Sequence, residues 1–501
     1  MKPLQLNEYV PRVVLGNQLP SKEPFILVGD SLAQHKLISG ITGQGKSRFI
    51  ASIVVQLLNE GIPFALIDPH SDLCDTVLRT LIASGFYEDA RAYEKLWYVD
   101  FSRTDAYLPF NVLQQPYPPH QVASNLLEGW KRAWSAIAEG NAVNLENVLE
   151  ASAYALIINE RPLTNLSRFL SDQVFRTGLL ANVTDPHITE FFHTRFDTWS
   201  RGKASSLSES TLRRSFLLTF EPSLRYTLGQ KENRLNFRQL MDNKTSLLLD
   251  LGNLDAQTQR FLGCLITIGI EQAALSRANS QNRGAYHFII DEFSQFCAQT
   301  GPSLERMLTL TRKFGLSVGM ACQTLSQTKD IKDALQNCLH ITFKLGYDDA
   351  TTVAPRLIDN TTAKRSLWQQ LFSSEQPLVD DGQKRVEWTQ LVKNLDPQEC
   401  LLHMSGKTFK LRTLTVPDPP LPGGALAHVK AVYAKQLLTP VKNIILAEDT
   451  PVQAAPVQLQ AKVVPIAKKQ AQAQPTPQIP PPSPPVSPSS RRRVQVDNTP
   501  T

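Results

Sequence analysis

Residues 40–47 of the chain read Gly-Ile-Thr-Gly-Gln-Gly-Lys-Ser, and this stretch decides the class of fold. It matches the phosphate-binding pattern G-x-x-x-x-G-K-S over its whole length. Glycine adopts backbone conformations that other residues resist, so successive N–H groups can point inward at phosphate oxygens. The pattern predicts that Lys46 reaches the β- and γ-phosphates of a nucleotide and that the Ser47 hydroxyl ligates Mg²⁺. We expect the nucleotide to contact Gly40, Ile41, Thr42, Gly43, Gln44, Gly45, Lys46, Ser47 and Arg48.

The sequence on either side of this phosphate loop supports the prediction. Residues 35–38 before it are suited to a strand, and Gly61 supplies a stop for the helix expected after it. That helix is predicted by apolar residues at i, i+3, i+4, i+7 and i+8, because this spacing places them on one face. These apolar residues are Ile50, Ile53, Val54, Leu57 and Leu58.

A second stretch, Tyr286 to Glu292, predicts a buried strand that ends in two carboxylates. A Mg²⁺ ion held by the phosphate loop needs an acidic residue opposite it, and Asp291 would bind the ion through water. Glu292, one residue further, could polarise the attacking water as a general base. The alternative, a strand followed by an acidic turn without a catalytic role, is common in α/β proteins.

Three further features have both a functional and a structural interpretation. Gln323 ends the predicted strand 316–322, where a neutral amide could sense the γ-phosphate, although a glutamine there is often only a loop residue. Arg312 and Lys313 close a helix, where they could interact with the helix dipole or supply one catalytic cation. Asp68 begins the turn Asp-Pro-His-Ser-Asp, in which His70 has no partner at metal-ligand spacing. We therefore favour a structural role for that turn.

Short β-branched runs alternate with longer amphipathic stretches, which indicates an α/β fold with a mainly parallel sheet flanked by helices. Between residues 107 and 237 the strand signals vanish, and helical patterns near 122–138, 144–158 and 206–218 predict an inserted all-helical subdomain. We divide the chain into a nucleotide-binding core in two parts, 1–106 and 238–415, the helical insertion 107–237, and a tail 416–501. The predicted strands are 36–39, 63–68, 96–101, 245–251, 286–291, 316–322 and 340–345.

The tail differs from the rest of the chain in composition and charge. Half of the 34 prolines fall between residues 417 and 500, which predicts a largely disordered segment with a transient helix near 425–438. Residues 451–501 hold six basic side chains against one acidic one, so nearly all of the net charge of +6 lies there. The positive charge is therefore no evidence for a basic surface on the folded part.

Composition excludes several classes of protein. Of the 501 residues, 42% are hydrophobic and 20% are charged, which is ordinary for a globular protein and excludes collagen-like and fully disordered chains. No run approaches the ~18 apolar residues of a membrane-spanning helix, and the N-terminus lacks the apolar core of a signal peptide. The six cysteines are scattered, as in a reducing compartment. We expect a cytoplasmic protein that reaches the inner membrane only through partners.

The stretches TGQGKS, IDPHSD, IIDEF and RKFGLSVGMACQ together resemble the HerA/FtsK superfamily of ring-forming, DNA-pumping ATPases. Within it the chain is most similar to type IV coupling proteins, the TraD/TraG-like ATPases of conjugation, over roughly residues 24–415. The resemblance implies a RecA-like core, ATP and Mg²⁺ at the interfaces of a hexamer, and DNA drawn through a central channel. By that match, Lys46, Ser47, Asp291, Glu292 and Gln323 take the family's roles, and Arg312 stands where its trans-acting arginine finger would be.

The sequence departs from the family in two places. Ser71 replaces the glycine of the usual DPHGD turn, and the membrane helices that precede the core of classical coupling proteins are absent. We therefore expect an ATP-dependent DNA translocase recruited by a relaxase, secretion-channel or nuclease partner, or acting as a soluble translocase. Alternatives are a HerA-like motor in DNA end processing, a protein-secretion ATPase, or a nucleotide-gated switch with slow hydrolysis.

Overall fold

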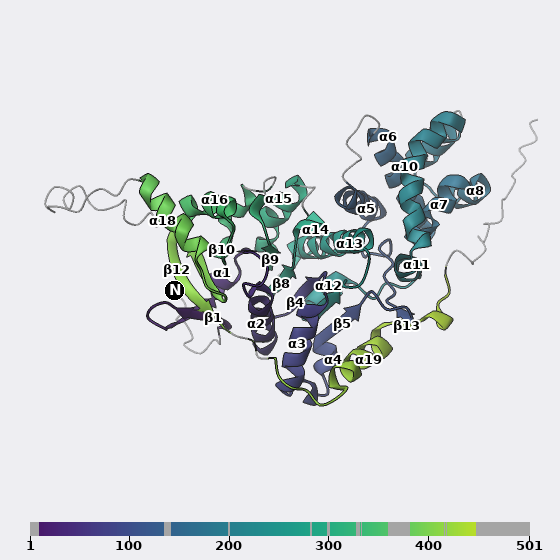
Figure 1. The fold of residues 1–501 in the computed structure, drawn as a ribbon. Helices are drawn as coiled ribbons and strands as arrows, with labels where there is room; N and C mark the ends of the chain where they lie inside the picture. Colours follow the sequence, from purple (N-terminus) through teal and green to yellow (C-terminus); the bar gives the residue numbers. More distant parts are fainter. Residues whose placement is uncertain are drawn as a thin grey trace, which may run out of the picture. The chain divides into compact units, whose positions relative to one another are not determined.

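A computed structural model describes residues 10–134, 142–198, 201–280, 283–297, 301–326, 331, 333–358, 381–414, 416 and 418–446. Among these residues, eleven strands form one sheet in the order β2-β1-β12-β11-β10-β3-β9-β8-β4-β7-β5 (Figure 1). The strands from β10 to β5 pair in parallel, and those from β2 to β11 pair antiparallel. The predicted α/β class with a mainly parallel sheet is confirmed.

The parallel strands coincide with the seven that the sequence predicts. They are β3 (Lys36–Ser39), β4 (Phe64–Asp68), β5 (Leu96–Asp100), β7 (Ser246–Asp250), β8 (Tyr286–Ile290), β9 (Leu316–Cys322) and β10 (Leu339–Thr342). The antiparallel strands, which the sequence analysis missed, are β1 (Arg12–Gln18), β2 (Pro24–Val28), β11 (Glu399–Met404) and β12 (Lys407–Thr413). A separate pair joins β6 (Ala106–Tyr107) to β13 (Thr439–Pro440).

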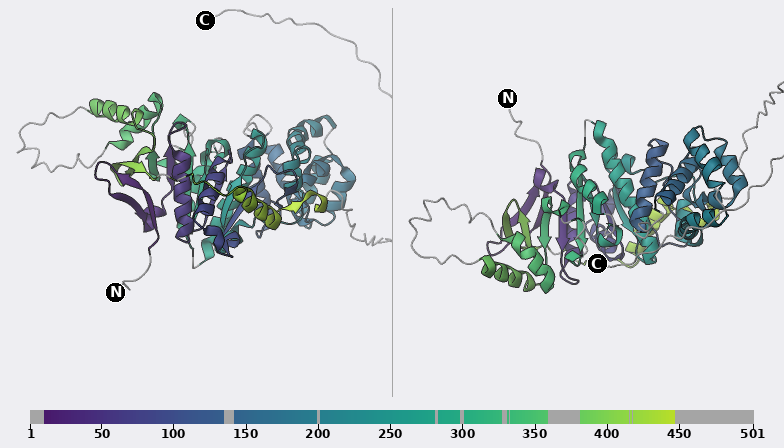
Figure 2. Two further views of the ribbon diagram at one scale, coloured as in Figure 1. Left: turned by 60° about the horizontal axis from the view of Figure 1, so that its bottom comes forward. Right: turned by 90° about the horizontal axis from the view of Figure 1, so that it is seen from above.

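Helices cover both faces of the parallel strands, which are therefore buried along most of their length. Because crossovers between parallel strands are right-handed, α2 (Lys46–Asn59) and α3 (Asp72–Ala83) lie on one face, and α13 (Ala256–Leu275) and α15 (Gly301–Leu310) lie on the other (Figure 2). The smaller elements are α1 (Gly29–Leu32), η1 (Phe86–Glu88), α4 (Ala92–Lys95), η5 (Ser276–Asn279), α14 (Ser294–Cys297), η6 (Arg312–Phe314), η8 (Ala334–Asn337), α16 (Tyr347–Leu357) and α18 (Asp381–Lys393).

One described segment, Ala256–Ala278, is long and apolar enough to cross a membrane by length and composition. It comprises α13 and the turn after it, and 78% of its most apolar window is buried inside the protein. Trp130 packs edge-on against Phe261 of this helix, with ring centroids 5.7 Å apart. We therefore assign the segment to the core.

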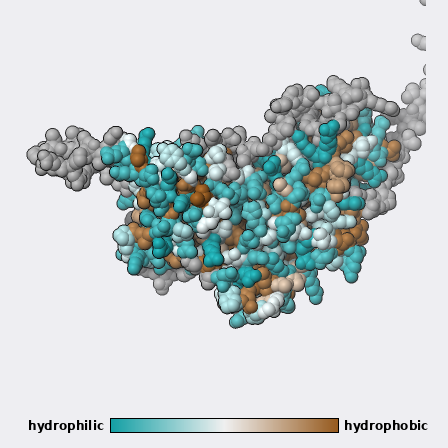
Figure 3. Space-filling view, in the orientation of Figure 1, coloured by the Kyte–Doolittle hydropathy of each residue, from teal (hydrophilic) through white to brown (hydrophobic). Residues whose placement is uncertain are grey.

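Between β6 and β7 the chain is helical. The elements are α5 (Pro119–Ala133), α6 (Ala142–Ile158), η3 (Leu163–Asn165), α7 (Leu166–Ser171), α8 (Gln173–Leu180), α9 (Pro186–Glu190), a π-helix (Phe191–Phe196), α10 (Arg201–Phe220), α11 (Pro222–Leu228) and α12 (Phe237–Asp242). The three predicted helices correspond to α5, α6 and α10. In the view of Figure 3, hydrophobic side chains interrupt the hydrophilic surface at several places, this region among them. The stacked pair Phe216 and Phe220 on α10 is exposed.

The helix predicted near 425–438 is present, but it is packed on the core and not transient, so the folded part of the chain continues past the predicted start of the tail at residue 416. Residues 418–446, here named the C-terminal strap, contain α19 (Ala425–Leu437), β13 and η10 (Val441–Asn443). The buried residues of α19 are Val429, Tyr433 and Leu437, and its Lys430 forms an ion pair of 2.5 Å with Asp75 of α3. The helix α19 is stabilised because its apolar face packs against the edge of the sheet. The tail from residue 447 on lies outside the described residues.

The strap covers β5, the edge strand of the sheet. It also forms hydrogen bonds with the chain where the core meets the helical region. Val441 N–H donates to the Asp105 carbonyl at 3.0 Å, next to the pairing of β13 with β6. Where the helical region ends, the Arg234 guanidinium donates to the Leu437 carbonyl at 2.8 Å. An edge strand covered in this way cannot pair with another chain.

Replacing Tyr433 by alanine should destabilise the fold by about 3–5 kcal/mol, the usual cost of truncating a buried aromatic side chain. The ring is fully buried among Tyr87, Tyr93 and Tyr98, and its hydroxyl shares a hydrogen bond of 3.2 Å with that of Tyr87. Tyr433→Phe removes only that hydrogen bond and should cost about 1 kcal/mol. Denaturant unfolding of the full chain measures both. A Tyr433→Ala variant as stable as the wild type would mean that the strap is not part of the core.

Candidate functional site

The phosphate loop connects β3 to α2 at the carboxyl edge of the parallel strands, where open α/β sheets bind their ligands. Gly43 and Gly45 have φ of +81° and +98°, conformations that side chains rarely adopt. Gly40 lies so close to its neighbour strand that a Cβ there would stand 2.6 Å from Cβ of Phe343. The glycines thus set both the shape of the loop and its approach to the sheet.

Lys46 lies inside this loop. Its ammonium donates to the carbonyl of Gly40 and, at 3.1 Å, to that of Ile41. Burial lowers the pKa of Lys46, and the carboxylates Asp291 and Glu292 oppose that shift. The cation is therefore held at the mouth of the loop by hydrogen bonds to two carbonyl oxygens, which an anionic phosphate can replace.

The first turn of α2 is open to a ligand. Gly45, which precedes this helix, has no side chain that could accept hydrogen bonds from the N–H groups of the first turn. Ser47 and Arg48 in that turn are exposed. Unsatisfied N–H groups and the helix dipole together favour an anion at such a helix end.

The two carboxylates predicted at the end of β8 lie beside the loop. Asp291 is buried, and its N–H donates to the carbonyl of Ile67 in β4 at 3.1 Å. Burial raises the pKa of Asp291 to about 6, and the carboxylates of Asp68 and Glu292 add to this shift. Glu292 has a left-handed φ of +48° and accepts a hydrogen bond of 3.3 Å from the Ser294 hydroxyl. Both carboxylates act on the charge of Lys46, but within the described residues no group of three or more His, Cys, Asp or Glu side chains could hold a metal ion by itself, so a divalent cation here would also need the phosphates of a nucleotide.

Gln323, which follows β9, meets the phosphate loop directly. The Thr42 hydroxyl donates to Gln323 Oε1 at 3.1 Å, and the Gly40 N–H donates to the Cys322 carbonyl at 3.2 Å. The strand order explains this contact, because β9 lies between β3 and β8. Gln323 is therefore placed between the loop and the two carboxylates.

Arg312 lies away from the phosphate loop of its own chain. It opens η6, just before β9 begins, and its side chain is exposed. This is the amino edge of the sheet, where His35 and Lys36 begin β3. Burial lowers the pKa of His35 to about 4, and the charges of Lys36 and Arg312 contribute. Of the predicted catalytic residues, Lys46, Glu292 and Gln323 come together, and Arg312 does not join them.

The turn after β4 lies beside the two carboxylates. Asp68 accepts hydrogen bonds of 2.8 Å from the N–H groups of His70 and Cys74. Ser71, which replaces the family's glycine, has a left-handed φ of +67°, and its hydroxyl donates to Asp250 Oδ1 at 2.7 Å. The serine thus takes the conformation that a glycine would take, and the hydrogen bond to Asp250 offsets the cost.

Gln398 is a site residue that the sequence analysis missed. Its N–H donates to the Gln44 carbonyl at 3.0 Å, and its side chain packs beside Gly45. On the same side, the Ile41 N–H donates to the Lys344 carbonyl at 2.9 Å. Backbone contacts of this kind do not depend on residue type, so no sequence pattern could have revealed them.

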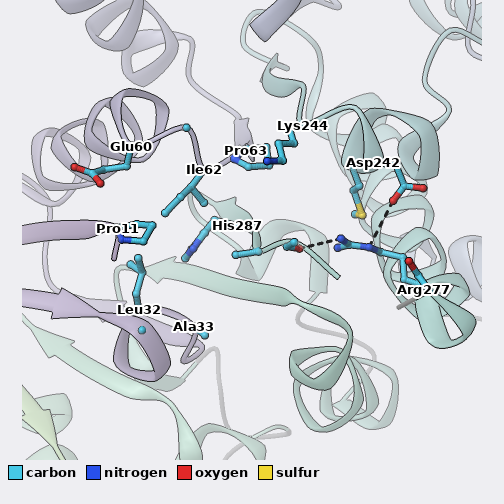
Figure 4. Close-up of a pocket in the computed structure, with 16 residues that line it drawn as sticks. Pro11, Leu32, Ala33, Glu60, Ile62, Pro63, Asp242, Lys244, Arg277 and His287 are labelled. Carbon is cyan, nitrogen blue, oxygen red and sulfur yellow. Dashed lines mark hydrogen bonds and ion pairs between the residues drawn. The ribbon is translucent and has the colours of Figure 1, made fainter. Parts of the chain in front are cut away.

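A cavity of about 540 Å³ opens at the opposite, amino edge of the sheet (Figure 4). His287 projects into it between Ile62 and Leu32, and Arg277 pairs with Asp242 at its rim. Since the phosphate loop and both carboxylates lie at the carboxyl edge, this cavity is separate from the candidate nucleotide site.

The sheet order and the site at its carboxyl edge define a RecA-like P-loop ATPase core. The family model of the HerA helicase central domain matches residues 13–266, and the chain belongs to this family. No curated protein matches the chain in sequence.

Solved structures of a conjugative coupling protein, TrwB, share the fold. An unbound form of TrwB superposes with a TM-score of 0.54 and 14% identity, covering 83% of this chain and 91% of that chain. TrwB in complex with ADP and Mg²⁺ superposes with a TM-score of 0.54 and 14% identity, and the match covers 84% of this chain and 92% of that chain. TrwB with the non-hydrolysable ATP analogue ADPNP superposes with a TM-score of 0.51 and 17% identity, and the match covers 82% of this chain and 90% of that chain. At these identities the likeness establishes the fold alone.

Proposed function

We propose that the protein is an ATP-hydrolysing DNA translocase of the conjugative coupling-protein kind. The observation that carries this proposal is the convergence of Lys46, Asp291, Glu292 and Gln323 at one edge of the sheet in a chain of the HerA family. The similarity to the coupling protein TrwB supports the assignment to conjugation or type IV secretion.

The residues of the site fit ATP and Mg²⁺. The loop glycines and the first turn of α2 would hold the phosphates, with Lys46 between the β- and γ-phosphates. The Ser47 hydroxyl and Asp291, the latter through water, would hold Mg²⁺, which neutralises charge on the phosphates when bound. One of the similar TrwB structures is a complex with ADP and Mg²⁺, and this supports the assignment.

Each remaining side chain has a separate task in hydrolysis. Glu292 would orient the attacking water and accept its proton, and Gln323 would sense the γ-phosphate from the neighbouring strand. Arg312, being exposed and distant from its own phosphate loop, would act on the nucleotide of the adjacent subunit. This division requires a neighbouring subunit at each nucleotide site. We propose that the assembly is a hexameric ring that draws DNA through its centre, in the cytoplasm or at the inner membrane through partners.

A steady-state ATPase assay with and without single- and double-stranded DNA tests this proposal. A translocase should hydrolyse ATP faster when DNA is present. A low rate that DNA leaves unchanged would indicate a nucleotide-gated switch, and stimulation by a secreted protein but not by DNA would indicate a protein-secretion ATPase. Either of these two results would overturn the proposal.

Residues 451–501, which lie outside the described residues, supply a further prediction. With six basic side chains against one acidic one, we propose that they tether the ring to DNA electrostatically or dock a relaxase, secretion-channel or nuclease partner. If they are a tether, their deletion should weaken DNA binding mainly at low salt and make the slope of log affinity against log salt shallower. ATP turnover without DNA should stay the same. Equal affinity and equal salt slope in the truncated chain would exclude the tether.

A further inference from the structure

The side chain of His70 does not hold its own turn in place. The turn is fixed by its backbone, since the His70 N–H donates to Asp68 Oδ1 at 2.8 Å. The imidazole is exposed, and no hydrogen bond or ion pair joins it to the described part of the chain. Its charge acts on the neighbouring carboxylates, since His70 opposes the rise in the pKa of Asp68 and of Asp291. An exposed imidazole on a rigid turn beside these carboxylates is available to a ligand.

The pairing of the strands places this turn next to the catalytic carboxylates. Ile67 pairs with Ile290, and the Asp291 N–H continues that pairing by donating to the Ile67 carbonyl at 3.1 Å. Asp68 and Asp291 therefore stand side by side, about 4.8 Å apart across the strands. His70 follows Asp68 by two residues, as Glu292 follows Asp291 by one, so both leave the sheet at the same edge.

The neighbouring strand holds the turn in a fixed conformation. Asp250, at the end of β7, accepts hydrogen bonds of 2.7 Å from the Ser71 hydroxyl and from the Tyr98 hydroxyl, and one of 3.0 Å from the Gly252 N–H. A Cβ at Gly252 would lie 1.9 Å from the Ser71 hydroxyl, so only glycine leaves room for this contact. Groups held by such a supporting network can contribute to catalysis without reorganising.

We propose that His70 is a further catalytic residue of the nucleotide site, which donates an imidazole N–H to an oxygen of the γ-phosphate. This inference rests on the proposed ATPase function. The γ-phosphate would lie between the phosphate loop and Asp291. Strand β4 neighbours β8 on the side away from β3, so the turn after β4 lies beside Asp291, and the charges of both Lys46 and His70 act on the Asp291 carboxylate. An imidazole keeps at least one N–H donor in either charge state, so the contact does not depend on protonation.

The arrangement assigns distinct roles to the residues of the turn. His70 would touch the substrate, whereas Ser71, Asp250 and Tyr98 are positioning residues that act through the backbone of the turn. Since the contact is to the γ-phosphate, it exists with ATP and is lost with ADP. His70 should therefore affect turnover and the discrimination between the two nucleotides, and leave the affinity for ADP unchanged.

The test compares His70→Ala, His70→Gln and the control His187→Ala, which removes an exposed imidazole from the helical region. We measure kcat, KM, and the affinities for ADP and for ADP with beryllium fluoride, a γ-phosphate mimic. His70→Ala should lower kcat by about 10-fold, less than the about 10²-fold of a preorganised donor, because the turn but not the imidazole is held in place. It should also weaken binding of the mimic without changing ADP affinity. His70→Gln, which keeps an N–H donor, should recover part of the loss.

Three results would overturn this proposal. His70→Ala could turn over ATP and bind the mimic as the wild type does. It could lose affinity for ADP and the mimic equally, which would indicate a structural role. It could lower the affinity for DNA in the absence of nucleotide, which would assign the imidazole to DNA. A wild-type protein that binds no ATP would instead contradict the proposed function itself.

Discussion

Lys46→Ala is expected to reduce ATP turnover by at least about 10²–10³-fold, the effect of losing one preorganised donor to a developing charge. In the structure the ammonium of Lys46 donates to the carbonyl oxygens of Gly40 and Ile41, which places this cation inside the phosphate loop. Nucleotide affinity should fall as well, because the lysine contacts the phosphates in the ground state. Steady-state turnover and equilibrium binding of ATP measure the two effects.

The matched control for this variant is Lys435→Ala, which removes an exposed lysine on α19. Its turnover should equal that of the wild type. If Lys46→Ala and Lys435→Ala both hydrolysed ATP at the wild-type rate, the phosphate loop would not be the site of hydrolysis.

Arg312→Ala and Glu292→Gln are each expected to be nearly inactive and to regain activity when mixed. An arginine finger supplied by a second protein is worth about 10³–10⁵ in rate where it has been measured. Arg312 is exposed at the amino edge of the sheet, whereas Glu292 lies at the carboxyl edge, so one subunit cannot bring them together. In a mixed ring, some interfaces join an intact Glu292 to an intact Arg312 of the neighbour.

The mixing experiment has a defined control. Each variant is titrated into the other at constant total protein, and co-assembly is verified by pulling down a tag carried by one of them. Activity should rise to a maximum near equal amounts and vanish in either pure variant. Failure to rescue in rings that demonstrably contain both variants would exclude a trans role for Arg312.

The parallel half of the sheet was predictable because its strands are buried on both faces. Such strands read as continuous apolar runs, as in Ser246–Asp250 and Tyr286–Ile290. Strand β12 (Lys407–Thr413) lacks this signal, since it is buried only at Leu411 and Thr413 and carries three basic side chains, and it was therefore missed. Strand β11 (Glu399–Met404) is buried over its first four residues, and the sequence analysis missed it nonetheless.

The boundary of the tail was wrong for a related reason. Proline-rich composition after residue 416 indicates disorder, but α19 buries Val429, Tyr433 and Leu437 on a surface supplied by distant parts of the chain. Local sequence does not reveal that surface. Likewise, the sequence located Lys46 and Glu292 but not Gln398, whose contact with the loop is made by its backbone.

The central claim, that ATP hydrolysis drives this protein along DNA, is tested most directly by displacement of streptavidin from a biotinylated DNA end. The wild-type protein should displace streptavidin from single- or double-stranded DNA when ATP and Mg²⁺ are present. It should not do so with ADP, and Lys46→Ala should not do so with ATP. A protein that hydrolyses ATP, binds both DNAs and still leaves streptavidin in place on each would contradict the account.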